Sequence, residues 1–97
     1  MPTYIILMNY TNDGIKGIKT VGARTETFNK GITSMGGKVI GHYGTMGQYD
    51  RISIIEMPDD DAMAELALRL GAGGVVRTTT VKAWPMADFI KIASKLP

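Results

Sequence analysis

The chain contains no cysteine and only one histidine among its 97 residues. The absence of cysteine excludes disulfides, thiolate catalysis, iron–sulfur clusters and zinc sites built on thiolates. Beyond the one histidine, only carboxylates remain as metal ligands, and the run Asp59–Asp61 is better explained as the start of a helix. We therefore expect no metal site and no cofactor.

Long apolar runs are also missing. The aliphatic run in the first predicted strand covers only residues 5–8, whereas a membrane-spanning helix needs about 20 apolar residues. A secretory signal has a basic region ahead of an apolar stretch, and the first residues of this chain have no such pattern. We expect a cytoplasmic protein that does not bind membranes.

The chain has little excess of charge of either sign. Eleven lysines and arginines stand against nine acidic residues, and the basic residues are scattered singly rather than clustered. This distribution lacks the electrostatic footprint of a nucleic-acid-binding protein. A single domain spanning residues 1–97 buries only about two thirds of its extended-chain surface, so its core is thin and self-association is expected.

Four segments have the composition of strands, and three have apolar residues at helical spacing. Short polar or acidic residues precede the first two helical segments, and glycines follow them. The predicted strands are residues 3–10, 38–43, 50–57 and 76–84, and the helices run from Thr11 to Gly36, from Asp59 to Gly71 and from Met86 to Lys95.

This βαββαβ order predicts an α+β fold with a four-stranded antiparallel sheet. Its first and third strands should be central, with both main helices on one face and a C-terminal helix added at the end. The other face would be largely apolar, because the central strands carry apolar residues at consecutive positions. Such a surface is too large for a monomer to expose, so we expect it to pack against the same face of a second copy.

Four short motifs occur in order along the chain: Asn9-Tyr10-Thr11, Thr45–Asp50, Glu56-Met57-Pro58-Asp59 and Val76–Thr80. Together they resemble the GYD domain family over nearly the whole chain. The resemblance implies a ferredoxin-like fold of the dimeric α/β-barrel class, in which two sheets face each other across a two-fold axis. That class includes cofactor-free monooxygenases, isomerases and haem enzymes, so it indicates no particular reaction.

Three residues are candidate catalytic groups. His42 could act as a proton shuttle or a haem ligand, or it could have only a structural role on its strand. Tyr49 and Asp50 could orient or deprotonate a phenol-like or enol-like substrate. Alternatively, they belong to a turn in which Gly47 supplies the permissive dihedral angles.

A second candidate site is predicted where strand ends meet. Asn9, Tyr10, Glu56 and Arg77 are expected to converge at one end of the sheet, either as an ion pair with a polar rim or as the anion-binding end of a pocket.

Tyr49 and Asp50 are expected at the opposite end of the sheet, near Thr3, Tyr43 and Trp84. At about 3.3 Å per residue, roughly 20 Å would separate them from the second site. A single small-molecule site within one protomer could then not use both groups.

The hypothesis we favour is a homodimer that binds a small organic molecule between its sheet and helices. One alternative is a cofactor-free monooxygenase or isomerase that uses His42, Tyr49 and Asp50. Another is a non-catalytic oligomerisation module whose sheet face and terminal helix make assemblies. A cavity of a few hundred Å³ would argue against the last of these.

Overall fold

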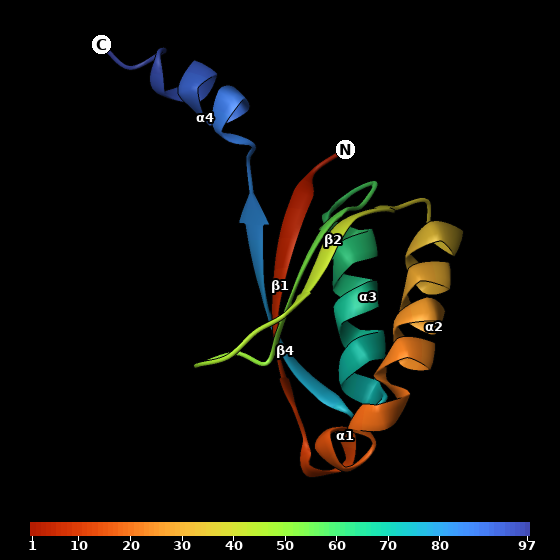
Figure 1. Ribbon diagram of the computed structural model, residues 1–97. Helices are drawn as coiled ribbons and strands as arrows, with labels where there is room; N and C mark the ends of the chain where they lie inside the picture. The colour runs from red at the N-terminus through yellow and green to blue at the C-terminus, as the bar shows by residue number, and fades with distance from the viewer.

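The computed structural model describes all 97 residues, and its centre is one antiparallel sheet in the order β2-β3-β1-β4 (Figure 1). As predicted, β1 and β3 are the central strands. The strands are β1 (Thr3–Tyr10), β2 (Lys38–Gly44), β3 (Arg51–Glu56) and β4 (Val76–Ala83).

Two helices, α2 (Val21–Ser34) and α3 (Asp60–Ala72), lie on the same side of the sheet (Figure 1). This arrangement confirms the predicted α+β ferredoxin-like fold. The Asp59 carboxylate caps α3 by accepting a hydrogen bond of 2.8 Å from the Ala62 amide. Two acidic residues in its first turn complement the helix dipole.

The core lies between the sheet and these two helices. Alternate residues of β1 point toward the helices because successive strand side chains face opposite sides. On α3, Met63 and Leu66 are buried and Ala67 and Leu70 are partly buried, which confirms the predicted apolar stripe. The buried apolar residues are Tyr4, Ile6, Met8, Ile32, Ile55, Met57, Met63, Leu66 and Val76.

The first predicted helix is not continuous. It consists of α1 (Asn12–Lys16), a 3₁₀ turn η1 (Ile18–Thr20) and α2. Thr11 caps α1 and also ties it to the start of β4, because its hydroxyl donates to the Gly74 carbonyl at 2.6 Å. The chain must turn again at Gly17 before α2 can cross the sheet. As a result Ile15 and Ile18 are exposed rather than part of the core stripe.

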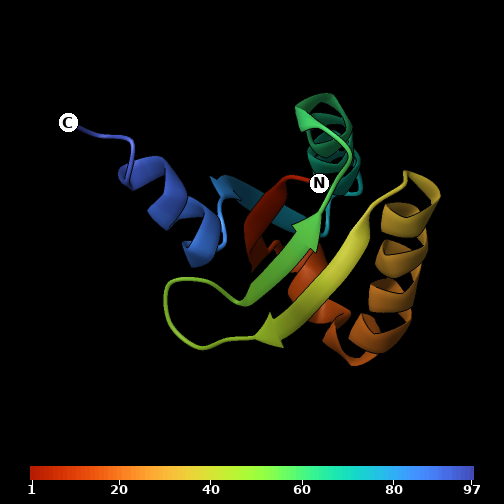
Figure 2. The same ribbon diagram turned by 90° about the horizontal axis from the view of Figure 1, so that it is seen from above.

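The C-terminal helix α4 (Met86–Ala93) projects away from the rest of the chain in both views (Figures 1 and 2). None of its residues is buried. The radius of gyration is 14.6 Å, above the value of about 12.5 Å for a compact chain of this length. The apolar face of α4 therefore has no partner within its own chain.

The sheet face opposite α2 and α3 is also uncovered and largely apolar. Strand register places on it Ile5, Leu7, Ile52, Ile54 and Val81. Only 12 of the 97 residues are buried, so the single chain has a thin core. No helix has the length and apolar character needed to cross a membrane.

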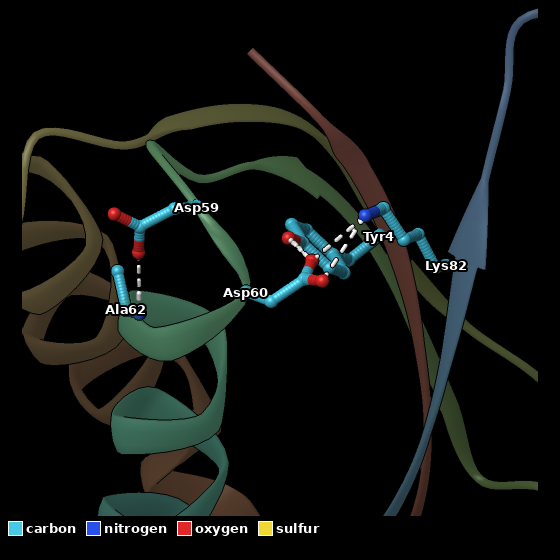
Figure 3. A network of polar contacts seen from close by, with 5 residues as sticks. All are labelled: Tyr4, Asp59, Asp60, Ala62 and Lys82. Atoms are coloured by element: carbon cyan, nitrogen blue, oxygen red, sulfur yellow. Dashed lines mark hydrogen bonds and ion pairs between the residues drawn. The ribbon is translucent and has the colours of Figure 1, made fainter.

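A cluster of polar side chains links the start of α3 to β1 and β4 (Figure 3). The Tyr4 hydroxyl donates to the Asp60 carboxylate, and the Lys82 ammonium lies 3.0 Å from the same group. The pKa of Tyr4 is raised to about 12, mainly by burial and secondly by the hydrogen bond to Asp60. The hydrogen bonds from Tyr4 and Lys82 lower the pKa of Asp60.

Candidate functional site

A cleft of about 440 Å³ opens where β2 ends and β3 begins, beneath the N-terminal half of α2. The turn η1 and α2 supply one wall, and the ends of β1 and β2 supply the other. Apolar side chains and a few polar groups share the lining, as in a site for a small organic molecule. The lining includes Tyr10, Ile18, Val21, Thr25, His42, Tyr43, Met46, Asp50 and Arg51.

A chain of four polar side chains runs from β3 through β2 to α2. The Asn29 Oδ1 atom can only accept, so it receives the proton of His42 Nε2 at 2.7 Å. His42 Nδ1 then accepts from the Ser53 hydroxyl at 2.7 Å. Ser53 in turn lies 3.4 Å from Arg51 Nε, which donates to it. Both ring nitrogens of His42 are therefore engaged by the protein.

The surroundings of His42 favour its neutral form. Burial lowers its pKa below the usual value of 6.5, and the positive charge of Arg51 lowers it further. The Phe28 ring packs against the imidazole with centroids 5.3 Å apart. A neutral imidazole with both nitrogens hydrogen-bonded must exchange a partner before it can transfer a proton.

Arg51 is the most unusual residue of the cleft. It is only 8% exposed, and its Nη1 donates to the Thr25 hydroxyl at 2.8 Å. The guanidinium also lies over the Phe28 ring, 5.6 Å from its centroid. The ion pairs of the chain are Glu65–Arg69 and Asp60–Lys82, so no carboxylate neutralises Arg51.

Asp50 lies in a different place from the one predicted. Its carboxylate accepts a 2.9 Å hydrogen bond from the Tyr10 amide, and its own amide donates to the Met8 carbonyl. The prediction that Tyr49 and Asp50 lie near Thr3 and Trp84, at the opposite end of the sheet from Tyr10, is wrong, because the start of β3 meets the end of β1. Tyr43 does lie nearby, since it lines the same cleft as Asp50.

The loop between β2 and β3 has the predicted turn geometry. Its ends are joined by a 2.9 Å hydrogen bond from the Thr45 amide to the Asp50 carbonyl, and the Thr45 hydroxyl donates to the Tyr49 carbonyl. Gly47 has a φ of +113°, which favours glycine. Asp50 and His42 both line the cleft, whereas Tyr49 does not.

The second predicted cluster does not assemble. Asn9 and Arg77 are paired across β1 and β4, and Tyr10 lies next to them in the chain. Glu56, however, is paired with Thr3 at the opposite end of the sheet. The error again comes from strand direction, since β3 ends where β1 begins. Arg77 forms no ion pair and is exposed, and of this cluster only Tyr10 lines the cleft.

Several site residues were missed by sequence reasoning. Ser53 interrupts the apolar run Ile52–Ile55, and a polar residue within such a strand is a usable signal for a buried hydrogen bond. Arg51 stands beside Asp50 at the start of that strand, but nothing in the sequence shows that it is buried. Asn29, Thr25 and Arg24 lie on the helix before β2 and reach the site only through packing.

The chain belongs to the GYD domain family, whose profile matches residues 4–93. A Thermus thermophilus protein named glutamine synthetase and cystathionine beta-lyase binding protein is 33% identical over 91 residues. The match covers 93% of this chain and 96% of that protein. The likeness therefore extends over nearly the whole of both chains.

Two solved structures support the fold. A crystal structure of a protein from Thermus thermophilus has a TM-score of 0.54 at 22% identity, covering 88% of this chain and 95% of the other. The feast or famine regulatory protein of M. tuberculosis, complexed with L-methionine, has a TM-score of 0.65 at 14% identity. That match covers 88% of this chain and 51% of the regulatory protein. At these identities the likeness concerns the fold alone.

Proposed function

We propose that this chain is a cytoplasmic, homodimeric protein that binds a small organic molecule in the cleft between α2 and the sheet. The observation that carries the proposal is the cleft itself, whose volume of about 440 Å³ lies within the usual range for small-molecule sites. His42, Thr25 and Arg51 are among its polar lining residues, beside apolar side chains such as Ile18 and Val21. These features are those of a site that orients a ligand through a few hydrogen bonds.

The dimer is proposed from two uncovered apolar surfaces. The open sheet face would bury its Ile, Leu and Val side chains against the same face of a second copy. The helix α4 extends beyond its own sheet with Phe89 and Ile92 about half exposed. A second copy seated on the open face would lie within reach of α4 and could cover its apolar side.

A mixed fragment screen tests the binding proposal. Purified, ¹⁵N-labelled protein is titrated with neutral, basic and acidic small molecules while amide signals are followed by NMR. We expect hits to shift the amides of His42 to Met46 and of Thr25, which border the cleft. Hits that shift only amides elsewhere, or no hits at all, would contradict the proposed site. Replacing Val21 with Trp, which narrows the cleft, should weaken binding of every hit.

A cofactor-free monooxygenase or isomerase is the second candidate. One observation favours it: His42 and Asp50 both line the cleft, while the third predicted residue, Tyr49, lies in the adjoining loop outside the lining. In this proposal the imidazole releases one of its two protein partners when the substrate enters. Turnover of a hit compound that stops in His42→Gln and persists in Asn29→Ala would support it.

A third candidate follows from the name of the Thermus relative, which describes binding to two metabolic enzymes. The identity of 33% over nearly the full length supports a similar protein-binding role here. Native mass spectrometry of this protein mixed with purified glutamine synthetase tests it directly. A stoichiometric complex supports the role, and two separate species exclude it for that enzyme.

A further inference from the structure

Two arginines share an unusual feature beside the cleft. Arg51 Nη2 and Arg24 Nε are buried nitrogen atoms without any hydrogen-bond partner. Buried donors are almost always satisfied in native proteins, so two such atoms in one chain call for an explanation. Both residues line the same small hollow of about 80 Å³ between α2 and the sheet.

Other nitrogen atoms of the same two side chains form hydrogen bonds with the protein. Arg24 Nη2 donates to the carbonyl of Gly17 at 2.7 Å and to that of Gly14 at 3.1 Å, so the helix break fixes its position. Arg51 is held by Thr25 and by the face of Phe28. The unpartnered nitrogens therefore belong to preorganised guanidinium groups rather than to freely moving side chains.

The charge of this pair is not balanced within the chain. A guanidinium cannot lose its proton in a protein, so burial must be compensated by a partner. Neither arginine has a carboxylate within 4.0 Å, although the chain contains nine acidic residues. Water can accept hydrogen bonds in the hollow but brings no negative charge. An acceptor that also carries charge has to come from outside the chain.

The size and lining of the hollow select among anions. Apart from the two arginines it is lined mainly by apolar groups, among them Met8, Phe28 and Leu70. A carboxylate has two acceptor oxygens, and the N–H groups of Arg51 Nη2 and Arg24 Nε are free to donate to them. A phosphate has four oxygens and would place more polar surface against the mostly apolar lining of a hollow of only about 80 Å³.

The hollow adjoins the larger cleft, because both are lined by Tyr10, Val21 and Arg51. We infer that Arg24 and Arg51 bind the carboxylate of a small organic acid whose remaining atoms extend into the cleft. The inference deepens the proposed function and depends on it. It assigns the specificity of the site to two residues outside the four sequence motifs.

Matched acid and amide probes test this inference. Butyrate, hexanoate and phenylacetate are compared with butyramide, hexanamide and phenylacetamide, each titrated while the Nε–H signals of the arginine side chains are followed by NMR. We expect the acids to shift the Arg24 and Arg51 signals and to bind at least 10-fold more tightly than their amides. Each charge-assisted hydrogen bond is strong enough for a difference of this size.

Substitutions of single arginines test which side chains bind the acids. Arg51→Gln and Arg24→Gln should each weaken acid binding about 10- to 100-fold and leave amide binding nearly unchanged. Arg69→Gln, a change at an exposed arginine of α3, should alter neither. If Arg51→Gln fails to fold, Arg24→Gln still decides the question, because its side chain lies at the helix break rather than in the sheet.

Two outcomes would overturn the inference. The first is equal binding of acids and amides, or acid binding that survives both variants; small-molecule binding would then stand while its assignment to the arginines fails. The second is that the acids shift no arginine signal. In that case the fragment screen with neutral and basic compounds decides separately whether the cleft binds ligands.

Discussion

Two polar clusters of this protein differ in how completely their hydrogen-bonding groups are paired. Near the start of α3, Tyr4, Asp60 and Lys82 form a cluster in which donor, acceptor and charge are matched. Near the cleft, Arg51 and Arg24 retain unpartnered donors. Structural clusters are expected to be satisfied, whereas unsatisfied buried groups indicate a binding role or bound solvent. The comparison of the two clusters supports placing the site at the second.

The Tyr4 cluster makes stability depend on pH at the alkaline end. Folding raises the pKa of Tyr4 to about 12, so the unfolded chain ionises first as the pH rises above 10. We expect the free energy of unfolding to fall between about pH 10 and 12. Chemical denaturation of the native protein and of Tyr4→Phe measures this, and the fall should be smaller in the variant.

Tyr43→Phe is the matched control, since the Tyr43 side chain is exposed and bonds to none of these groups. Its free energy of unfolding should fall between about pH 10 and 12 by as much as that of the native protein. Asp60→Asn should lower the pKa of Tyr4 only in part, because burial is the larger cause and is unchanged by this substitution. An equal loss of stability in the native protein and in Tyr4→Phe would contradict the assignment.

At the scale of elements, the break between α1 and α2 positions the site. The short helix α1 packs against the start of β4, where Gly14 approaches the Val75 carbonyl so closely that a Cβ atom would lie 1.9 Å from its oxygen. The break then presents the carbonyls of Gly14 and Gly17 to Arg24. A continuous helix would not present these two carbonyls to the arginine.

Gly14→Ala should therefore destabilise the protein by about 1–3 kcal/mol, because the clash is with backbone atoms that cannot easily move. Gly22→Ala is the control: its Cβ meets nothing within 4 Å in α2, so it should stabilise by about 0.5–1 kcal/mol. Urea denaturation of the two variants measures both effects. A Gly14→Ala protein as stable as the native one would show that α1 can shift.

At the scale of the whole molecule, the open sheet face and α4 remain unpartnered within one chain. An exposed sheet face of this composition is unfavourable in water, and a short amphipathic helix is marginally stable without a docking surface. Both problems are solved if two chains pack face to face. The dimer remains a proposal, supported by the open face, by α4 and by the thin core.

Native mass spectrometry should find the protein at twice the mass of the 10.5 kDa chain. Ile54→Lys places a charge on the open face and should give a monomer, while Leu68→Lys on the exposed side of α3 should not. Phe89→Asp should weaken the dimer if α4 crosses to the partner. A native monomer would overturn the pairing of the sheets, and an unchanged dimer in Phe89→Asp would remove α4 from the interface.

The element order, the central strands, the α3 stripe and the caps were predictable from the sequence, because periodicity and capping act over a few residues. Site geometry was less predictable. The grouping of Glu56 with Arg77 failed because it depended on the end of the sheet at which each strand finishes. The break at Gly17 was missed because it results from the docking of α1 on β4, which involves residues about 60 positions apart.

By itself the sequence determined the fold class, through local spacing of apolar residues and through glycine and aspartate at helix ends. It also determined the family, through four short motifs in order. Only the tertiary structure decided which polar groups meet. Strand register brings Ser53 beside His42, and packing of α2 buries the charge of Arg51 without a carboxylate. Burial and charge pairing arise from contacts between distant segments, and no local pattern encodes them.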